Sequence, residues 1–221
     1  TVVLIAECES QEIHAIRPVE QGGWGLDAVW SDDFHHACRV AATGRREAYY
    51  TDYRGSPQEL ISLLKRGFLY QGQRYEWQRK SRGTEVKDEP ASGFVFYLQN
   101  HDQIGNSVYG ERLPMQTSPG RYRALLALLL LAPQTPMLFM GQESGAASPF
   151  LFFVDYAGNE IGSQVFRGRK TFLSQFPSYA TQEAQQAIAD PNDSSTFERS
   201  KLNVGEGYTE TPFYRLHADL L

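Results

Sequence analysis

Four short apolar segments recur along this chain, and each one ends in polar or acidic residues. They span residues 2–6, 26–30, 94–98 and 137–140. Apolar runs of this length that stop abruptly are typical of strands buried in a parallel sheet. Because the polar residues always follow the strand, the pattern predicts a sheet that presents its chemistry at the carboxyl ends of its strands.

Helical patterns fill the gaps between these segments. Residues 34–42 and 58–66 follow the second segment, with a Ser-Pro pair at 56–57 as the start of the later helix. Residues 121–131 follow the third segment and are apolar on nearly every side, which predicts a well buried helix. Beyond Phe150 the strand pattern stops. Alternating strands and helices predict parallel strands joined by right-handed crossovers.

Two α/β architectures place functional residues at the carboxyl ends of parallel strands: the (β/α)8 TIM barrel and the open doubly wound sheet. The open sheet usually carries a glycine-rich phosphate turn after its first strand, whereas residues 7–10 read Glu-Cys-Glu-Ser. The barrel is therefore the favoured fold class. Since four strands make half of such a barrel, we expect a partial barrel.

The composition narrows the classes of function. The 221 residues are 41% hydrophobic and 13% aromatic, which is enough for a folded core. A net charge of −5 and scattered basic residues argue against a nucleic-acid partner. The longest apolar run, residues 124–132, is too short for a membrane span, and no signal peptide is recognisable. Cys8 and Cys38 lack metal-ligand spacing, which favours free thiols in a cytoplasmic protein.

The most informative segment is residues 94–106, FVFYLQNHDQIGN. Four polar residues, Asn100, His101, Asp102 and Gln103, arrive together where its apolar run ends. In an α/β barrel this point lies on the active-site face. The alternative is a capped strand end, in which asparagine and aspartate only satisfy the backbone of a loop.

A carboxyl pair would turn this polar strand end into a catalytic site. Glu7 follows the first apolar segment by one residue, where we expect a half-buried carboxyl with a raised pKa, suited to a general acid. Asp102 would supply a second carboxyl from another strand end, and two carboxyls on either side of a sugar are the arrangement of glycoside hydrolysis. The alternative for Glu7 is an ion pair with a basic residue of the barrel rim.

A dense polar cluster follows the second segment and consists of Asp32, Asp33, His35 and His36. Contact with sugar hydroxyls and capping of the helix that starts near residue 34 are the favoured interpretations. A metal site is the weaker one, because adjacent histidines point in different directions on a strand or a helix. Among the many aromatic residues, Trp77 is the best candidate to stack on a sugar ring.

Taken together, these strand ends resemble one family. The motifs on which the resemblance depends are LIAE at 4–7, DAVWSDDFHHA at 27–37, QNHDQIGN at 99–106, LFMGQE at 138–143 and TFERSKL at 196–202. The resemblance is to the malto-oligosyltrehalose trehalohydrolases of the α-amylase superfamily, and it covers nearly the whole chain.

The resemblance implies a retaining glycoside hydrolase that cuts the α-1,4 bond next to the trehalose end of maltooligosyltrehalose. Calcium occurs in some α-amylase relatives, but no acidic loop in this sequence would fix it, so we expect no metal or other cofactor. The resemblance makes Glu7 the general acid/base and Asp102 the carboxylate that stabilises the transition state. The remaining implied substrate contacts form three groups. Beside Asp102 they are Asn100, His101 and Gln103. On the trehalose side they are Asp32, Asp33, His35 and His36, and in a closing loop they are Tyr53 and Trp77.

The chain departs from the family in one respect. The family's nucleophile is an aspartate after the fourth barrel strand, which would precede Thr1, and Asp27 opens a strand instead of following one. We therefore expect residues 1–221 to be the C-terminal part of the catalytic barrel, about strands five to eight. The other half-barrel, a partner of this part, and a C-terminal β-domain would be absent.

An isolated chain of this kind is expected to be inactive, because no glycosyl-enzyme forms without a nucleophile. Two alternatives stay open. The first is a glycogen branching or debranching relative, which would share the glutamate and the Asn-His-Asp sequence. The second is a non-catalytic glucan-binding protein built on a partial barrel.

Overall fold

The computed structural model describes residues 2–156, 158–205 and 208–221. They form two compact units, which are treated separately below. The first unit comprises the described residues of Thr1–Leu98, Pro119–Leu138 and Leu220–Leu221. The second comprises those of Gln99–Ser118 and Phe139–Asp219.

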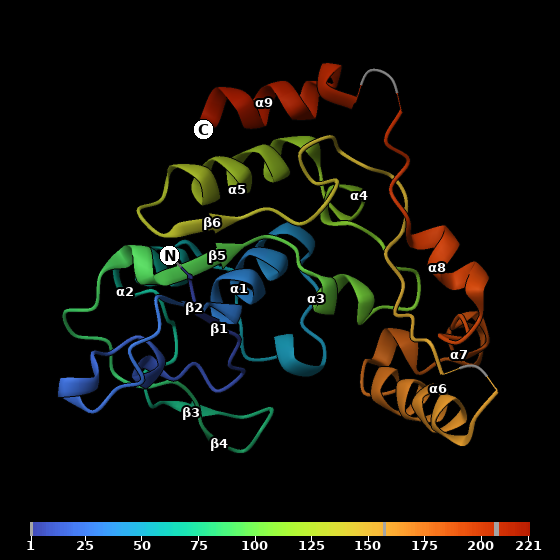
Figure 1. Ribbon diagram of the computed structural model, residues 1–221, viewed down its shortest axis with the longest axis horizontal. Helices are drawn as coiled ribbons and strands as arrows, with labels where there is room; N and C mark the ends of the chain where they lie inside the picture. Colours follow the sequence, from blue (N-terminus) through green and yellow to red (C-terminus); the bar gives the residue numbers. More distant parts are fainter. Residues whose placement is uncertain (1, 157, 206–207) are drawn as a thin grey trace. The chain divides into compact units, whose positions relative to one another are not determined.

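A parallel sheet forms the centre of the first unit. The elements of this unit are β1 (Ile5–Ala6), β2 (Ala28–Trp30), α1 (Asp32–Thr43), α2 (Pro57–Arg66), β3 (Arg74–Tyr75), β4 (Lys80–Ser81), β5 (Phe94–Tyr97), α5 (Pro119–Leu131) and β6 (Thr135–Met137). Four of the strands pair in parallel in the order β1-β2-β5-β6 (Figure 1). Their register places Ala6 beside Val29, Trp30 beside Val95, and Tyr97 beside Met137. The predicted α/β class with a parallel sheet is confirmed.

The strands are shorter than predicted, and the fourth is displaced towards the N-terminus. Residues 137–140 were expected, whereas β6 spans Thr135–Met137 and Met140 lies in a turn. The start of β6 was missed because it contains Pro136, and proline is rare in strands and is tolerated mainly at a sheet edge. β6 is such an edge among the described residues.

The core of the first unit lies between β5 and its helices. All four residues of β5 are buried, and the Phe96 ring stacks on Phe34 of α1 with ring centroids 4.0 Å apart. α2 begins at Ser56 and Pro57 as predicted, with a capping box between Ser56 and Glu59. It ends at Gly67, which has a left-handed φ of 78° and leaves no room for a Cβ, since one would lie 2.3 Å from the Phe94 ring. The end of α2 therefore packs against β5 at a position where only glycine fits.

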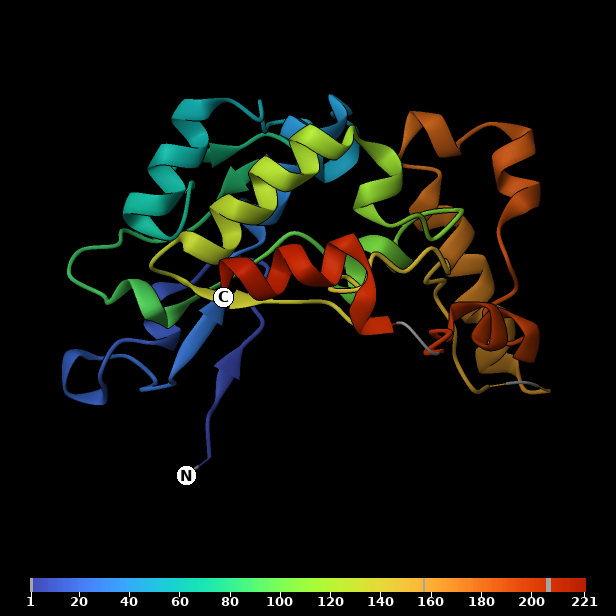
Figure 2. The ribbon, with the colours of Figure 1, turned by 90° about the horizontal axis from the view of Figure 1, so that it is seen from above.

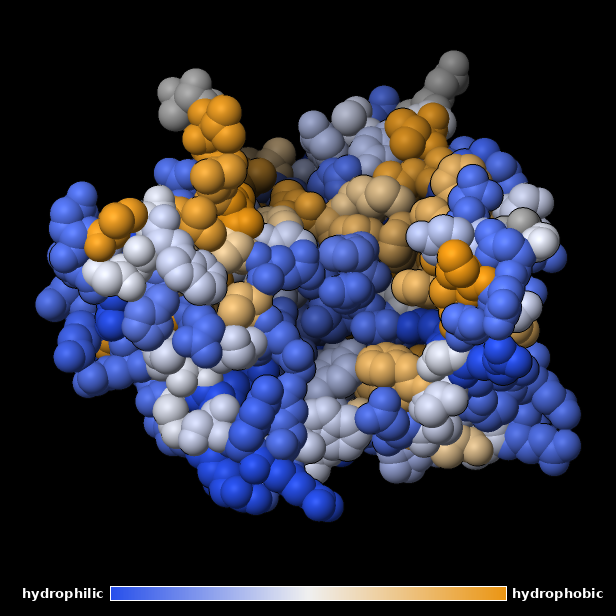
Figure 3. Space-filling view, turned by 60° about the horizontal axis from the view of Figure 1, so that its bottom comes forward, coloured by the Kyte–Doolittle hydropathy of each residue, from blue (hydrophilic) through white to orange (hydrophobic). Residues whose placement is uncertain are grey.

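The β1 edge of the sheet is apolar and exposed. The N-terminal segment leads away from the rest of the first unit before β1 pairs with β2 (Figure 2). Its consecutive exposed side chains are Val2, Val3, Leu4 and Ile5. Apolar side chains also form a column on the face shown in Figure 3. Among the described residues β1 is therefore a sheet edge with exposed apolar side chains, a feature that natural proteins usually cover.

The second unit is built from helices and loops. Its helices are α3 (His101–Gly105), α4 (Leu113–Gln116), α6 (Glu160–Leu173), α7 (Gln182–Ala187), α8 (Ser194–Ser200) and, except for Leu220, α9 (Pro212–Leu220). Arg169 of α6 is buried and donates to Asn106 Oδ1 and to the Gly105 carbonyl, which ties α6 to the end of α3. α9 begins at Pro212, so Ala218, Asp219 and Leu220 form its last turn.

None of the helices in the described part of the chain has the length and apolar character needed to cross a membrane.

Candidate functional site

Glu7 lies directly after β1 and is exposed. The expected half-burial is therefore wrong, and β1 is the outermost strand of the described parallel sheet. The loop that follows is nevertheless well defined. Buried Gln11 donates from Nε2 to the Cys8 carbonyl at 3.0 Å and to the Trp30 carbonyl at 3.4 Å. Gln11 thus links the loop that carries Glu7 to the end of β2.

Asp33 is fully buried and accepts four hydrogen bonds inside the first unit. Its Oδ1 accepts from the Tyr53 hydroxyl at 2.6 Å and from Arg82 Nε at 3.1 Å. Its Oδ2 accepts from the backbone N–H groups of Leu69 and Tyr70, both at 2.9 Å. This differs from the expected contact with sugar, since protein donors occupy both oxygens. A buried carboxylate needs such partners, and here it anchors the long segment between α2 and β5.

Asp32 precedes Asp33 in the first turn of α1 and retains some exposure, with 17% of its side chain accessible. It accepts a hydrogen bond from the Tyr97 hydroxyl and lies 4.0 Å from Arg82 Nη2. Burial raises the pKa of Asp32 to about 6, although Tyr97 and Arg82 favour the ionised form. The charges of Asp33 and Glu7 add to the rise in pKa.

The cap of α1 is Ser31, not Asp32 or Asp33. The Ser31 Oγ accepts from the Phe34 N–H at 3.4 Å and donates to the Gly67 carbonyl at 2.7 Å. The aspartates therefore lie one and two residues inside the helix, where a negative charge favours the helix N-terminus. Capping by an aspartate, one of the two favoured interpretations, is wrong at this helix.

The two histidines are buried in an aromatic environment. His35 donates from Nδ1 to the Leu98 carbonyl at 2.9 Å, which leaves Nε2 to accept from the Tyr50 hydroxyl at 3.3 Å. Both nitrogens are thus occupied by protein groups, and burial lowers the pKa of His35 to about 3. His36 packs against the rings of Tyr49, Tyr50 and Tyr53. Burial also lowers the pKa of His36 well below its ordinary value, so both rings are neutral.

Tyr53 and Trp77 were expected to close over the substrate together, but their environments are opposite. Tyr53 is completely buried, and its hydroxyl is used on Asp33. Trp77 lies between β3 and β4 with 37% of its surface exposed, and its backbone N–H donates to Asp52 Oδ2 at 3.0 Å. The neighbouring Gln78 donates to Glu9, two residues beyond Glu7. Of these two aromatic side chains, only that of Trp77 is exposed.

The Asn-His-Asp-Gln segment begins the second unit. Asn100 is buried, and its Oδ1 accepts from the Gln103 N–H at 2.9 Å, which caps α3. The capping alternative is thus confirmed for Asn100. His101 and Asp102 differ from it: each side chain is 51% exposed, and their nearest N and O atoms are 3.5 Å apart. Gln103 is half-buried. The exposed acid of this segment is Asp102.

Two functional residues were missed by the sequence analysis. Arg82 follows the β3–β4 hairpin and bridges Asp32 and Asp33 while being almost completely buried. Its position in the sequence carries no signal, because neighbouring basic residues are exposed. The sequence did contain a signal for Tyr97, since a tyrosine in a fully buried strand needs a partner for its hydroxyl.

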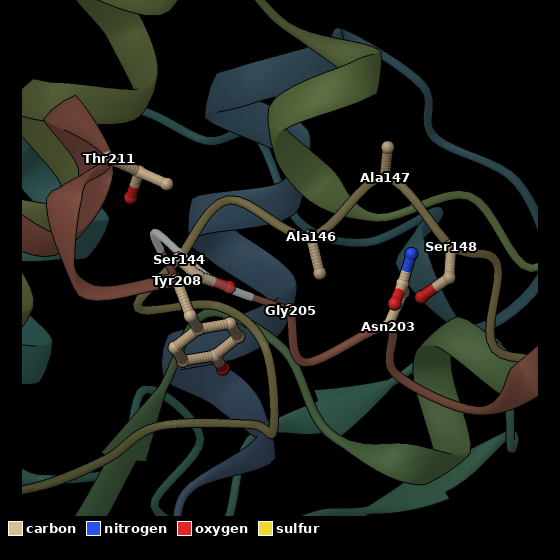
Figure 4. A pocket seen from close by; sticks show the side chains of 8 residues that line it. All are labelled: Ser144, Ala146, Ala147, Ser148, Asn203, Gly205, Tyr208 and Thr211. Atoms are coloured by element: carbon tan, nitrogen blue, oxygen red, sulfur yellow. The ribbon is translucent and has the colours of Figure 1, made fainter.

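A cavity of about 480 Å³ lies within the second unit (Figure 4). Small and neutral polar residues line it: Ser144, Ala146, Ala147, Ser148, Asn203, Gly205, Tyr208 and Thr211. The Tyr208 hydroxyl donates to Glu143 of the LFMGQE motif. The Ser144 hydroxyl donates to the Gly141 carbonyl at 3.2 Å, so these two lining hydroxyls already have partners within the protein.

Similarity to known proteins covers nearly all of the chain. It is 42% identical over 202 residues to a malto-oligosyltrehalose trehalohydrolase of Deinococcus radiodurans, which is 89% of this chain and 32% of that protein. It is 37% identical over 221 residues to the enzyme of the same name from Arthrobacter ramosus, which is 100% of this chain and 36% of that protein. The chain thus spans about a third of the length of the curated relatives it matches.

A solved structure supports the same relationship. A crystal structure of a candidate alpha amylase from Salmonella typhimurium superimposes with a TM-score of 0.82 at 37% sequence identity. The match covers 99% of this chain and 37% of that one. No family model matches the chain. The resemblance predicted from the motifs is confirmed.

Proposed function

We propose that this chain, which belongs by sequence to the malto-oligosyltrehalose trehalohydrolase family, is part of a retaining glycoside hydrolase that releases trehalose from a maltooligosyltrehalose. The observation that carries the proposal is the contrast in exposure among its acidic side chains. Glu7, directly after β1 in the first unit, and Asp102, in the first turn of α3 in the second unit, are exposed, whereas Asp33 is buried in the first unit. Acids that meet a substrate need exposure, and strand ends are where such folds place them.

The proposed roles follow the chemistry of these groups. Glu7 donates its proton to the leaving glycosidic oxygen and later removes a proton from water. Asp102 stabilises the positive charge that develops on the sugar ring in the transition state. Asp32, His101, Gln103 and Trp77 contact sugar hydroxyls or ring faces.

The buried residues of the site have a different proposed role. The side chains of Asp33, His35, His36 and Tyr53 hold the strand end in place, because their polar groups lie inside the first unit. Asn100 does the same for α3 through its cap. These five residues would affect a substrate only through the groups that they position.

The nucleophile is proposed to lie outside residues 1–221, in the other half of a TIM barrel of which this chain forms about strands five to eight. Asp27, which superficially fits the family's nucleophile, precedes β2, and its Oδ2 accepts from the Leu4 N–H at 2.8 Å. It therefore belongs to the wrong end of its strand for this chemistry. An isolated chain is proposed to be inactive, without cofactor, and cytoplasmic in origin.

The test is trehalose release from maltooligosyltrehalose by the full-length parent protein. We expect Glu7→Gln to reduce the rate by roughly 100- to 10,000-fold, the usual contribution of a general acid. Glu20→Gln is the matched control, because Glu20 is an exposed glutamate of the same unit outside the strand ends. The 221-residue chain alone should release no trehalose.

Three outcomes would contradict the proposal. Altered branch points without free trehalose would indicate a branching or debranching relative. Glucan binding by the parent without any turnover would indicate a non-catalytic protein. Full activity of Glu7→Gln would remove the assigned acid.

A further inference from the structure

A second cavity lies in the second unit, between the start of α6 and the turn that precedes α8. Its volume is about 730 Å³, a size typical of pockets that hold small molecules. One wall includes Tyr156 and residues from the first two turns of α6, and the other includes Asp190, Asn192 and Asp193. None of the lining residues has a part in the reaction proposed above, so a different role is needed to explain the cavity.

Hydrogen bonds hold the two walls of the cavity together. The Val154 N–H donates to the Pro191 carbonyl at 2.8 Å. Asn192 donates from Nδ2 to the Gly162 carbonyl at 3.1 Å and to Asp190 Oδ1 at 3.0 Å. A Cβ at Gly162 would lie 2.6 Å from Asn192 Oδ1, so the turn packs on the bare backbone of α6. The cavity is therefore formed before any ligand arrives, which lowers the entropy cost of binding.

Several groups in the lining keep their capacity to bind a ligand. Tyr156 is 43% exposed, and Arg167 is an exposed residue one turn after Ser163 on the same face of α6. In the part of the chain that the structure describes, neither the Tyr156 hydroxyl nor the Arg167 guanidinium has a hydrogen-bond or ion-pair partner. Asp190 Oδ1 accepts two hydrogen bonds from Asn192, whereas no described residue donates to Oδ2. The lining therefore offers a ring face, a donor and an acceptor.

The charges of the lining point to a neutral ligand. An anion would meet the carboxylates of Glu160, Asp190 and Asp193, which disfavour it. A metal ion needs several converging ligands, but the described residues of the second unit do not by themselves place three carboxylate, imidazole or thiol ligand atoms within 4.8 Å of one another. A neutral molecule rich in hydroxyl groups can instead accept from Arg167 and donate to Asp190 at once. A sugar also has an apolar ring face, which suits the ring of Tyr156.

We propose that this cavity binds a stretch of an α-glucan chain, with a glucose ring stacked on Tyr156 and its hydroxyls bound to Arg167 and Asp190. The sugar class follows from the lining, whereas the choice of an α-glucan rests on the function proposed above. The cavity acts by binding alone, since it contains no residue of the proposed reaction. A second point of attachment raises the affinity of the protein for long glucan chains.

The test is titration calorimetry of maltoheptaose, an α-glucan chain without a trehalose end, into the full-length parent protein. We expect Tyr156→Ala and Arg167→Ala each to weaken one class of maltoheptaose sites by roughly tenfold, through loss of about 50–60 Å² of covered ring surface or of a charged hydrogen bond. Tyr156→Trp, which keeps an aromatic ring, should retain the binding of the wild type. Both positions are exposed, so the unfolding transition should stay the same.

Tyr109→Ala is the matched control, because Tyr109 is an exposed tyrosine of the same unit that does not line the cavity. This variant should leave the binding of maltoheptaose unchanged. Unchanged binding in both Tyr156→Ala and Arg167→Ala would overturn the proposal.

Trehalose release by the same parent protein separates this proposal from the proposed function. If the parent released no trehalose but its binding of maltoheptaose still depended on Tyr156 and Arg167, the function would fail and the glucan site would stand. An active enzyme whose binding of maltoheptaose depends on neither residue would overturn the glucan site and leave the function intact.

Discussion

The turn from β2 into α1 and the turn from β5 into α3 are built on the same local plan but treat their acids in opposite ways. Each helix has a polar N-cap, Ser31 or Asn100, and each carries acidic residues in its first turn. In α1, which has 12 residues, Asp33 is fully buried. In α3, which has 5 residues, the Asp102 side chain is 51% exposed.

The difference comes from distant parts of the chain. Asp33 receives hydrogen bonds from residues 20 to 49 positions further along, including Tyr53 and Arg82. Asp102 instead contacts the adjacent His101, with the nearest side-chain N and O atoms 3.5 Å apart. An acid near a strand end is therefore structural where distant residues donate hydrogen bonds to its carboxylate. It is available for chemistry where no distant residue does so.

Neutralising each acid in turn tests whether the buried and the exposed carboxylate differ in their contribution to stability. Asp33→Asn should lower the free energy of unfolding by about 3–5 kcal/mol, because it removes the nearer of the two carboxylates that pair with the buried guanidinium of Arg82. Asp102→Asn should change it by less than about 0.5 kcal/mol, as expected for an exposed side chain. Urea unfolding followed by circular dichroism measures both. Equal losses would show that burial does not distinguish the two acids.

A smaller effect is expected from the pH dependence of stability. The folded pKa of Asp32 is about 6, above its ordinary value of 3.8, so its favourable contribution is complete below pH 4 and is lost as pH rises through 6. The loss amounts to about 3 kcal/mol in total. Asp32→Asn lacks a titrating group at this position. The stability of the wild type relative to this variant should therefore fall between pH 4 and 7, and a constant difference would contradict the raised pKa.

The smallest effects concern the two caps. Ser31→Ala should cost about 2 kcal/mol, because it removes both the bond from Phe34 and the bond to the buried Gly67 carbonyl. Asn100→Ala should cost about 1 kcal/mol, since only the bond from Gln103 is lost. Thermal unfolding of the two variants side by side tests the order. A larger cost at Asn100 would mean that α3 depends on contacts beyond its cap.

Local patterns in the sequence predicted the elements of this fold well and the burial of its site residues poorly. The strand-and-helix alternation and the Ser56 capping box depend on neighbours in the sequence, which is why both were predictable. The burial of Asp33 and His35 depends on Arg82, Tyr50 and Leu98, which lie 15 to 63 residues away. Nothing in the Asp-Asp-Phe-His-His sequence itself distinguishes Asp32, which keeps some exposure, from the fully buried Asp33.

The motifs nevertheless identified the family, because a resemblance depends on residue identity and not on exposure. The same DDFHH block that suggested sugar contacts contains residues that the structure places in the core.

The most direct test of this account is trehalose release by the parent protein carrying Asp102→Asn, measured together with its unfolding transition. The account predicts a fall in kcat of about 100- to 1000-fold, as for loss of one group that stabilises a charged transition state, with an unchanged unfolding transition. Activity close to that of the wild type would show that this exposed acid takes no part in the chemistry and would contradict the central claim.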